Sequence, residues 1–412
     1  MKYILKKMYI LSLPFTSAFA LTPVLPIPMI VIFLLGLSFV ITDKFNKKIV
    51  IDNADRILLV FLFFVYFSFI LNISNMTNIN TPINHLISYS VSIFGLYLFV
   101  KHLFYEDIDL NIILKFITFA VLLSSIFAIF EFLDKNFLNI GVDSYIYRPV
   151  APNMEVLATN FLFRARSFAE EPAHFALFLE IFAPLSIYYL IHNKYSNILI
   201  YGYVLVILFS LLFSFSSASF VIIPSATALT VLYFFIKNKN VFKKKSFFKL
   251  IVYSFFFIFF LSFLLEYFNL FTFIDLIDTV VNKITGSSSS EDRLGRVDEF
   301  YSLFLNADII NLLFGFGPAA YTNHNISSMV SLYLTLLLEF GFVGLGLFLF
   351  FLLLVLKKIL TISSYVKYFL LIGYFSSIAH YALISNYWYP WFWFLVVLIG
   401  IIKNKEKNVH NI

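Results

Sequence analysis

The sequence predicts an all-α polytopic integral membrane protein with about 12 transmembrane helices, because apolar runs of about 20 residues recur from residue 8 to residue 402. The composition agrees with this class. Hydrophobic residues make up 61% of the 412 residues and charged residues only 13%, against about 45–50% and about 25% in a soluble domain. The mean hydropathy of the whole chain is +0.91. An ordinary soluble enzyme is therefore excluded.

The chain contains no cysteine, which excludes disulfide bonds, thiolate metal sites and a thiol nucleophile. The first apolar run, Met8 to about Thr22, follows Lys2, Lys6 and Lys7 and so looks like a cleavable signal peptide. Because many further runs follow it, we interpret it as the first membrane anchor. The expected helices cover residues 8–22, 25–42, 57–73, 83–100, 112–133, 173–191, 197–213, 218–236, 250–268, 326–356, 368–385 and 389–402.

Lysines predict the orientation of these helices in the membrane. With the N-terminus in the cytoplasm, alternating spans place most lysines on the cytoplasmic side, as the positive-inside tendency requires. This side then has Arg56, Lys101, Lys194 and the lysines near residues 44–48, 237–249, 357–367 and 403–407. Both termini are then cytoplasmic. Residues 1–412 form a single transmembrane domain, with outer loop one at about 134–172 and outer loop two at about 269–325. Function is expected in these two loops. The net charge of +6 gives no indication of nucleic-acid binding.

Arginines are distributed differently from lysines. Five of the six arginines fall in the outer loops, whereas only two of the 23 lysines do. Guanidinium groups bind phosphate or carboxylate in a planar, bidentate manner, so this pattern favours an anionic ligand. The alternative is that each arginine pairs with a carboxylate of the same loop and holds the loop folded. These arginines are Arg148, Arg164, Arg166, Arg293 and Arg296.

Outer loop one ends in a segment typical of a helix start. It contains Arg164, Arg166, Ser167, Glu170, Glu171, Pro172 and His174. The serine and the first glutamate have capping-box spacing, and the proline suits a first helical turn. A phosphate group would be favoured at this helix N-terminus beside the two arginines. Alternatively, the two glutamates cap the helix and neutralise the arginines, and the histidine is simply hydrogen-bonded at the helix start.

Outer loop two contains a serine-rich hinge over residues 286–290 and then an amphipathic helix. We expect Leu294, Val297, Tyr301 and Phe304 to share its apolar face along the bilayer surface. Two arginines of this helix, Arg293 and Arg296, are three residues apart. This spacing suits a pyrophosphate, although Asp292 and Arg296 also have the spacing of an ordinary surface ion pair.

His324 is the best acid–base candidate. We expect it at or just before the start of the helix over residues 326–356, where the helix dipole favours the neutral imidazole that accepts a proton. Two carboxylates, Glu180 and Glu339, fall deep inside expected helices and need a partner or a cavity. They are candidates for a proton relay in a transporter, or for hydrogen bonds that fix helix packing. The sequence shows no matching pair of interrupted helices, which weakens the transporter interpretation.

Two sequence segments carry a resemblance to a known family. The first is Leu313-Phe-Gly315-Phe-Gly317-Pro followed by His324-Asn325, and the second is Glu339-Phe-Gly341-Phe-Val-Gly344. Together they resemble the signature of the O-antigen polymerase and ligase superfamily, and the expected architecture is similar to that of its Wzy-type polymerases over the whole chain. The resemblance implies a metal-independent glycosyltransferase without a cofactor, in the bacterial inner membrane. Such an enzyme polymerises undecaprenyl-pyrophosphate-linked repeat units into O-antigen or capsular polysaccharide.

The resemblance also implies roles for individual residues. His324 would be the catalytic base, and the substrate pyrophosphate would be bound by Arg166 and by either Arg293 or Arg296. From its position beside the helix start, we predict Arg164 as a further pyrophosphate ligand. We also predict supporting roles for Glu170, Glu171, His174, Asn325 and Glu339. The implied partners are the lipid-linked glycan donor and acceptor, membrane lipid, a chain-length regulator and a flippase. Two alternatives stay open: an O-antigen ligase that transfers the glycan to lipid A core, and, from a different class, a flippase or other transporter of lipid-linked glycans.

Overall fold

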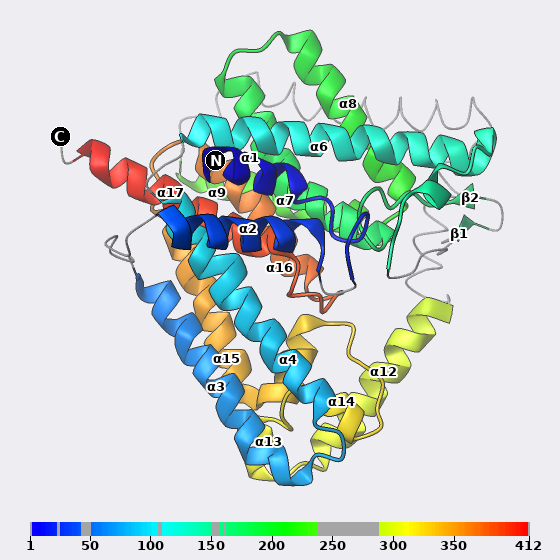
Figure 1. Cartoon of the computed structure of the whole chain (residues 1–412), viewed down its shortest axis with the longest axis vertical. Coiled ribbons are helices and arrows are strands. Elements are labelled where there is room, and N and C mark those ends of the chain that lie inside the picture. The colour runs from blue at the N-terminus through cyan, green and yellow to red at the C-terminus, as the bar shows by residue number, and fades with distance from the viewer. Residues whose placement is uncertain are drawn as a thin grey trace.

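The computed structural model describes residues 2–22, 25–42, 51–105, 109–149, 157–159, 162–237 and 288–410, and it is mostly helical (Figure 1). Seven helices in this part of the chain are long and apolar enough to cross a membrane. They are α3 (Asn53–Asn72), the continuous segment α4 to α5 (Asn80–Phe104), α6 (Leu110–Leu133), α7 (Pro172–His192), α8 (Asn197–Ser214), α9 (Ser217–Lys237) and α15 (Leu332–Leu360). The predicted class, a helical membrane protein, agrees with this finding.

Shorter or more polar elements complete the described structure. The helices are α1 (Lys2–Ser12), α2 (Ile27–Thr42), α12 (Ser288–Leu305), α13 (Ile309–Phe314), α14 (Ala320–Asn323), α16 (Val366–His380) and α17 (Pro390–His410). Between α6 and α7, the strands β1 (Leu157–Thr159) and β2 (Leu162–Phe163) form a small antiparallel hairpin. The ninth expected helix, residues 250–268, lies outside the described residues.

The first expected helix, residues 8–22, was placed too late in the sequence. Helix α1 ends at Ser12, two residues before Pro14. Proline lacks the N–H that would continue the helical hydrogen bonds, and it disfavours helical backbone in the preceding residue. The following residues are irregular: the N–H groups of Ser17 and Ala18 donate to the carbonyl of Phe168, and that of Phe19 donates to the carbonyl of Tyr147. This segment therefore packs against outer loop one.

The expected continuous helix over residues 326–356 was also wrong. Helix α15 begins only at Leu332 and is broken at Gly341, whose backbone has φ 63° and ψ −166°. Only glycine adopts this conformation without strain. The described part of the chain therefore does contain an interrupted helix, contrary to the prediction of a continuous one. An uninterrupted apolar run gives no warning of such a break except the glycine itself.

The helices are arranged in two groups (Figure 1). In that view α1, α2, α6 and α7 lie across the upper half, while α3, α4 and α15 run together toward the lower end, where α12 to α14 lie. Helix α15 packs on α3, and α7 packs on α6, α8 and α16. Both chain termini lie on the left of the view, and the hairpin of β1 and β2 lies on the right. Helix α7 is the most enclosed of the long apolar helices.

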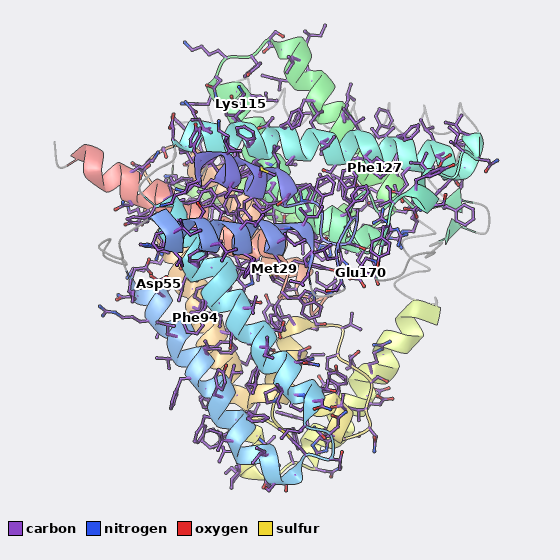
Figure 2. All side chains as sticks on the ribbon, in the orientation of Figure 1. Met29, Asp55, Phe94, Lys115, Phe127 and Glu170 are labelled. Carbon is purple, nitrogen blue, oxygen red and sulfur yellow. The ribbon has the colours of Figure 1, made fainter. Side chains whose placement is uncertain are left out.

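Lysines that were predicted to share one membrane surface do lie near one another. The Nζ atoms of Lys101 and Lys358 lie 2.8 and 2.7 Å from Oδ2 of Asp52, and Lys403 donates to the carbonyl of Thr361. After the predicted sidedness of the chain, we call this region the inner end and the region of β1, β2 and α12 to α14 the outer end. Figure 2 shows Asp55, at the inner end, and Glu170, near the outer end, on opposite sides of the molecule.

Candidate functional site

Outer loop one contains a buried ion cluster centred on Asp143. Arg166 donates from Nη2 to Oδ2 of Asp143 at 2.8 Å, and Arg148 donates from Nε to Oδ1 at 3.1 Å. The Nζ atom of Lys135 lies 3.1 Å from Oδ2. Both arginines are only 1% exposed. Two of the five outer-loop arginines therefore bind a carboxylate of their own loop, as the second interpretation of the arginines requires.

Electrostatics in this cluster favour the ionised aspartate. Burial alone would raise the pKa of Asp143, but the charges of Arg148, Lys135 and Arg166 outweigh it and hold the pKa below its ordinary value. The same arginines also hold the loop backbone, since Arg148 donates to the carbonyls of Ala169 and Ser167 at 2.7 and 2.5 Å. The cluster thus fixes the path of the chain into α7.

The outer end of α6 supplies two more buried carboxylates. Oε2 of Glu131 accepts the N–H groups of Arg166 and Ser167 at 3.0 and 2.7 Å. Asp134 accepts three consecutive N–H groups, those of residues 140–142. Glu131 is only 1% exposed. Its role is to hold a loop in which Ser167 adopts a left-handed backbone conformation with φ 52°.

The start of α7 differs in part from its prediction. The helix does begin at Pro172, as predicted, but the expected capping box does not form. The hydroxyl of Ser167 instead donates to the carbonyl of Ser124, and Glu170 accepts the hydroxyl of Tyr389 at 2.8 Å. The N-cap residue, Glu171, makes no side-chain capping bond. Ser167 lies before the N-cap position, Glu171, and is therefore too early in the chain to cap this helix.

His174 and Arg164 both have protein partners. Nδ1 of His174 lies 3.0 Å from the hydroxyl of Tyr389, so this histidine is hydrogen-bonded at the helix start, the simpler of its two interpretations. Arg164 donates from Nε to the carbonyl of Ser214 at 2.8 Å. Arg164 thus connects the segment before α7 to the end of α8, and His174 connects the start of α7 to the segment before α17.

The predicted apolar face of α12 is divided in the structure. Phe304, a member of that face, is buried and packs in a cluster with Phe300 and Phe316. Two other members, Leu294 and Tyr301, are 63% and 52% exposed. Exposed apolar side chains are also what a contact with lipid requires, so the stripe along the bilayer surface stays a prediction.

One arginine of α12 is held against the segment that precedes α15. Arg296 donates from Nη1 to the carbonyl of Ser328 at 3.0 Å, and Glu299 accepts the N–H of Ser327 at 2.7 Å. The side chains of Arg293 and Asp292 lie outside the described residues. Arg296 is partly exposed, unlike Arg166.

The glycine turn before α14 sits directly on the break in α15. The N–H groups of Phe316 and Gly317 donate to the carbonyls of Leu338 and Glu339 at 2.9 and 3.0 Å. A Cβ on Gly315 would lie 2.3 Å from the backbone of Glu339, and Gly315 has φ 76°. The two segments that carry the family resemblance are therefore packed against each other through backbone contacts that only glycine permits.

Glu339 lies at the centre of this junction and is fully buried. Its Oε1 accepts the N–H of Ala319 at 2.8 Å, and its Oε2 accepts the hydroxyl of Tyr89 at 2.9 Å. Nδ1 of His85 lies 3.1 Å from Oε1. Glu339 thus has the polar partners that a carboxylate buried deep inside a helix bundle needs. Sequence reasoning missed His85 and Tyr89, because they precede Glu339 by about 250 residues and have no charged neighbours in sequence.

His324 does not begin a helix. It follows the last residue of the short helix α14, eight residues before α15, and its ring packs edge-on against Phe316 with 4.8 Å between ring centroids. The predicted position at a helix N-terminus was therefore wrong. The pKa of His324 is lowered, as predicted, but the cause is partial burial rather than a helix dipole. Its neighbour Asn325 is exposed and has a left-handed backbone with φ 52°.

The predicted site residues thus form two groups at the outer end. The first group lies at the start of α7 and consists of Arg164, Arg166, Glu170 and His174. The second group surrounds Glu339 and continues into α14 and α12. The segment before α17 links the groups: Tyr389 binds Glu170 and His174, while the ring of Tyr387 stacks on that of Tyr89 at 4.1 Å. Glu180 belongs to neither group and is paired with His380 at 2.9 Å in the interior.

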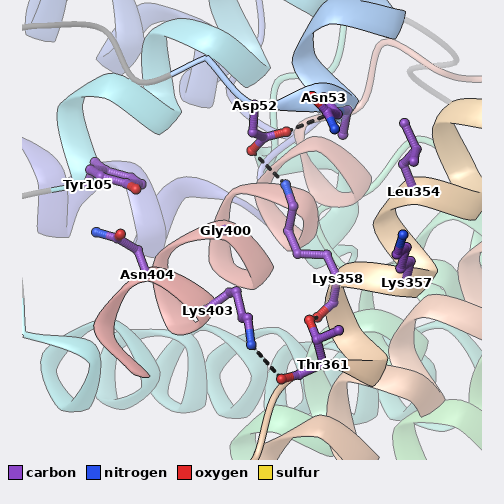
Figure 3. Close-up of a pocket in the computed structure, with 11 residues that line it drawn as sticks. Asp52, Asn53, Tyr105, Leu354, Lys357, Lys358, Thr361, Gly400, Lys403 and Asn404 are labelled. Carbon is purple, nitrogen blue, oxygen red and sulfur yellow. Dashed lines mark hydrogen bonds and ion pairs between the residues drawn. The ribbon is translucent and has the colours of Figure 1, made fainter. Parts of the chain in front are cut away.

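A pocket of about 380 Å³ lies at the opposite, inner end (Figure 3). It is lined by Asp52, Asn53, Ala54, Tyr105, Leu354, Lys357, Lys358, Thr361, Gly400, Lys403 and Asn404. None of the predicted site residues lines it. Three of its four charged side chains are lysines, and Asp52 is already bound to Lys358.

Within the described part of the chain, no three histidine or carboxylate side chains are grouped so that they could hold a metal ion. Comparison with protein-family models and with curated proteins gave no match to this chain.

Proposed function

We propose that this protein is a polysaccharide polymerase of the bacterial inner membrane that joins undecaprenyl-pyrophosphate-linked repeat units at the outer face. The observation that carries the proposal is the junction of the Gly315 turn with the break at Gly341. Both segments of the family resemblance meet there, although about 25 residues separate them. The chain-wide topology of about 12 spans and two outer loops belongs to the same proposal.

In this reaction a hydroxyl group of one lipid-linked repeat unit attacks the anomeric carbon of the chain carried on another. The bond from that carbon to the pyrophosphate oxygen breaks, and undecaprenyl pyrophosphate leaves. Arginines near the leaving group stabilise its developing charge, and a histidine accepts the hydroxyl proton. No metal ion enters the proposed mechanism.

The surroundings of the arginines suggest how the pyrophosphate role is divided. Arg166 is buried on Asp143, so it supports the shape of outer loop one rather than a direct contact to substrate. Arg296 is partly exposed, and its Nη1 binds the chain just after His324. We therefore assign the pyrophosphate contact to Arg296, together with Arg293 one helical turn earlier.

Arg296→Lys should raise the KM for the lipid-linked donor about 10-fold or more, because a lysine cannot reproduce a bidentate contact worth roughly 1.5–3 kcal/mol. The measurement is polymer formation by purified protein in lipid vesicles with increasing donor. Arg56→Lys, at the predicted cytoplasmic side, serves as the matched control and should leave KM unchanged. Equal KM values for Arg296→Lys and wild type would remove Arg296 from the pyrophosphate site.

The activity itself is tested by comparing surface polysaccharide from cells that lack the gene with the same cells carrying it on a plasmid. We expect a product capped at one repeat unit without the gene and full-length chains with it. Loss of all surface glycan with accumulation of lipid-linked polymer would identify the ligase instead. Accumulation of single lipid-linked units inside the cell would identify a flippase.

A further inference from the structure

We propose that His85 is the side chain that accepts the proton of the attacking hydroxyl group, with Glu339 as its positioning residue. This inference rests on the proposed function, since it names the proton acceptor of that reaction. It replaces His324, which the sequence alone favours.

The imidazole of His85 lies beside a fixed carboxylate. Nδ1 of His85 lies 3.1 Å from Oε1 of Glu339, and Glu339 is otherwise bound only as an acceptor, by the hydroxyl of Tyr89 and the N–H of Ala319. A carboxylate in such surroundings attracts the Nδ1 proton. The other nitrogen, Nε2, is then unprotonated and able to accept a proton, which is the arrangement general bases use.

The surroundings of the Glu339 carboxylate are rigid. Tyr89, which donates to Glu339, is stacked on Tyr387 with 4.1 Å between ring centroids and 6° between ring planes. The backbone of Glu339 is bound by Gly317 N–H and by the hydroxyl of Ser68. Because this carboxylate cannot move freely, the imidazole 3.1 Å away has a fixed partner before substrate binds.

The imidazole of His85 is accessible, unlike the carboxylate beside it. The side chain of His85 is 21% exposed, whereas that of Glu339 is buried. Nε2 of His85 lies 3.5 Å from the hydroxyl of Tyr321, a long contact that a closer hydroxyl group can replace. A sugar hydroxyl that took the place of the Tyr321 hydroxyl would have its proton directed at Nε2.

The other histidines near a carboxylate or near the outer end fit less well. His380 is bound to Glu180, but both side chains are 0% exposed, so no substrate reaches them. His174 shares the hydroxyl of Tyr389 with Glu170 and is itself buried. His324 is exposed but has the ring of Phe316 beside it. Among the described side chains, His85 combines an orienting carboxylate with an accessible nitrogen.

The proposed step conserves atoms and charge. As the hydroxyl oxygen forms its bond to the anomeric carbon, its proton moves to Nε2 of His85. The bond from the anomeric carbon to the pyrophosphate oxygen breaks, and its electron pair leaves with undecaprenyl pyrophosphate. The imidazolium formed beside Glu339 then releases its proton to water, which restores the starting state.

The test compares His85→Gln with the matched variant His324→Gln, each purified in lipid vesicles and supplied with a lipid-linked repeat unit. General-base catalysis is worth about 100-fold or more, so His85→Gln should reduce the polymerisation rate at least about 100-fold. His324→Gln should stay within about threefold of wild type. Glu339→Gln should change the pH dependence of the rate as well as its maximum, an effect that a purely structural residue would not produce.

A second measurement does not depend on folding of the His85 variant. Diethyl pyrocarbonate is added to His324→Gln protein, and modified histidines are located by mass spectrometry. Loss of activity should parallel modification of His85, and added lipid-linked substrate should slow both. Modification of His85 without loss of activity, or a fully active His85→Gln, overturns the inference alone. A wild-type protein that forms no polymer overturns the proposed function and this inference together.

Discussion

Gly341→Ala is expected to destabilise the folded protein by about 4 kcal/mol or more. The backbone at Gly341 has φ 63° and ψ −166°, a region that costs any other residue roughly 1–3 kcal/mol. An added Cβ would also lie 2.5 Å from the backbone of Leu313, which cannot move without pulling the glycine turn off α15. The N–H groups of Phe316 and Gly317 would then lose their acceptors, at about 1–3 kcal/mol each.

The measurement is thermal unfolding in detergent, followed by the loss of monodisperse protein. Gly346→Ala is the matched control, because it lies in the same helix and has no atom within 4 Å of the added Cβ. Alanine is the better helix former there, so the control should gain roughly 0.5–1 kcal/mol. Similar melting temperatures for the two variants would show that the break in α15 is not required.

Much of the fold follows from local sequence. Apolar runs predict the helices because each span must satisfy its own backbone hydrogen bonds in a membrane. Pro172 marks the start of α7 for an equally local reason, since its missing N–H costs nothing in a first turn. Pro14 is a local signal of the same kind, and the end of α1 at Ser12 could have been predicted from it.

The break at Gly341 is a different case. Glycine tolerates both helical and left-handed backbone, so its presence allows a break without requiring one. What requires the break is the turn at Gly315, whose N–H donors and close backbone approach come from another part of the chain. A tertiary contact of this kind has no signature within the helix itself.

The sequence predicted several residues of the candidate site but not which residues contact one another there. The sequence correctly identified Glu339 as a buried carboxylate that needs partners, yet those partners, His85 and Tyr89, lie in α4. For Arg166, the sequence left two partners open, an anionic ligand or a carboxylate of its own loop. An anionic ligand and a carboxylate bind a guanidinium group in the same way. Only the folded path of the loop therefore determines that Arg166 binds Asp143.

Asp143→Asn should destabilise the protein by about 3 kcal/mol or more at neutral pH. The change keeps the size of the side chain but leaves Arg148 and Arg166 buried without their carboxylate, and removing one partner of a buried pair costs roughly 3–5 kcal/mol. Asp109→Asn is the matched control. Asp109 is 62% exposed and lies 3.8 Å from Lys405, and asparagine caps α6 equally well, so its loss should cost less than about 1 kcal/mol.

The pH dependence gives a second test of the same aspartate. Its folded pKa lies below the ordinary value because three cations outweigh the effect of burial, so the carboxylate contributes its full stability above the unfolded pKa of about 3.9. That contribution is lost as the pH falls through the lower, folded pKa. Wild type and Asp143→Asn should therefore differ most in melting temperature above about pH 4 and converge as the pH falls further. A difference that stays constant down to pH 2 would mean that Asp143 stabilises the loop by its shape rather than by its charge.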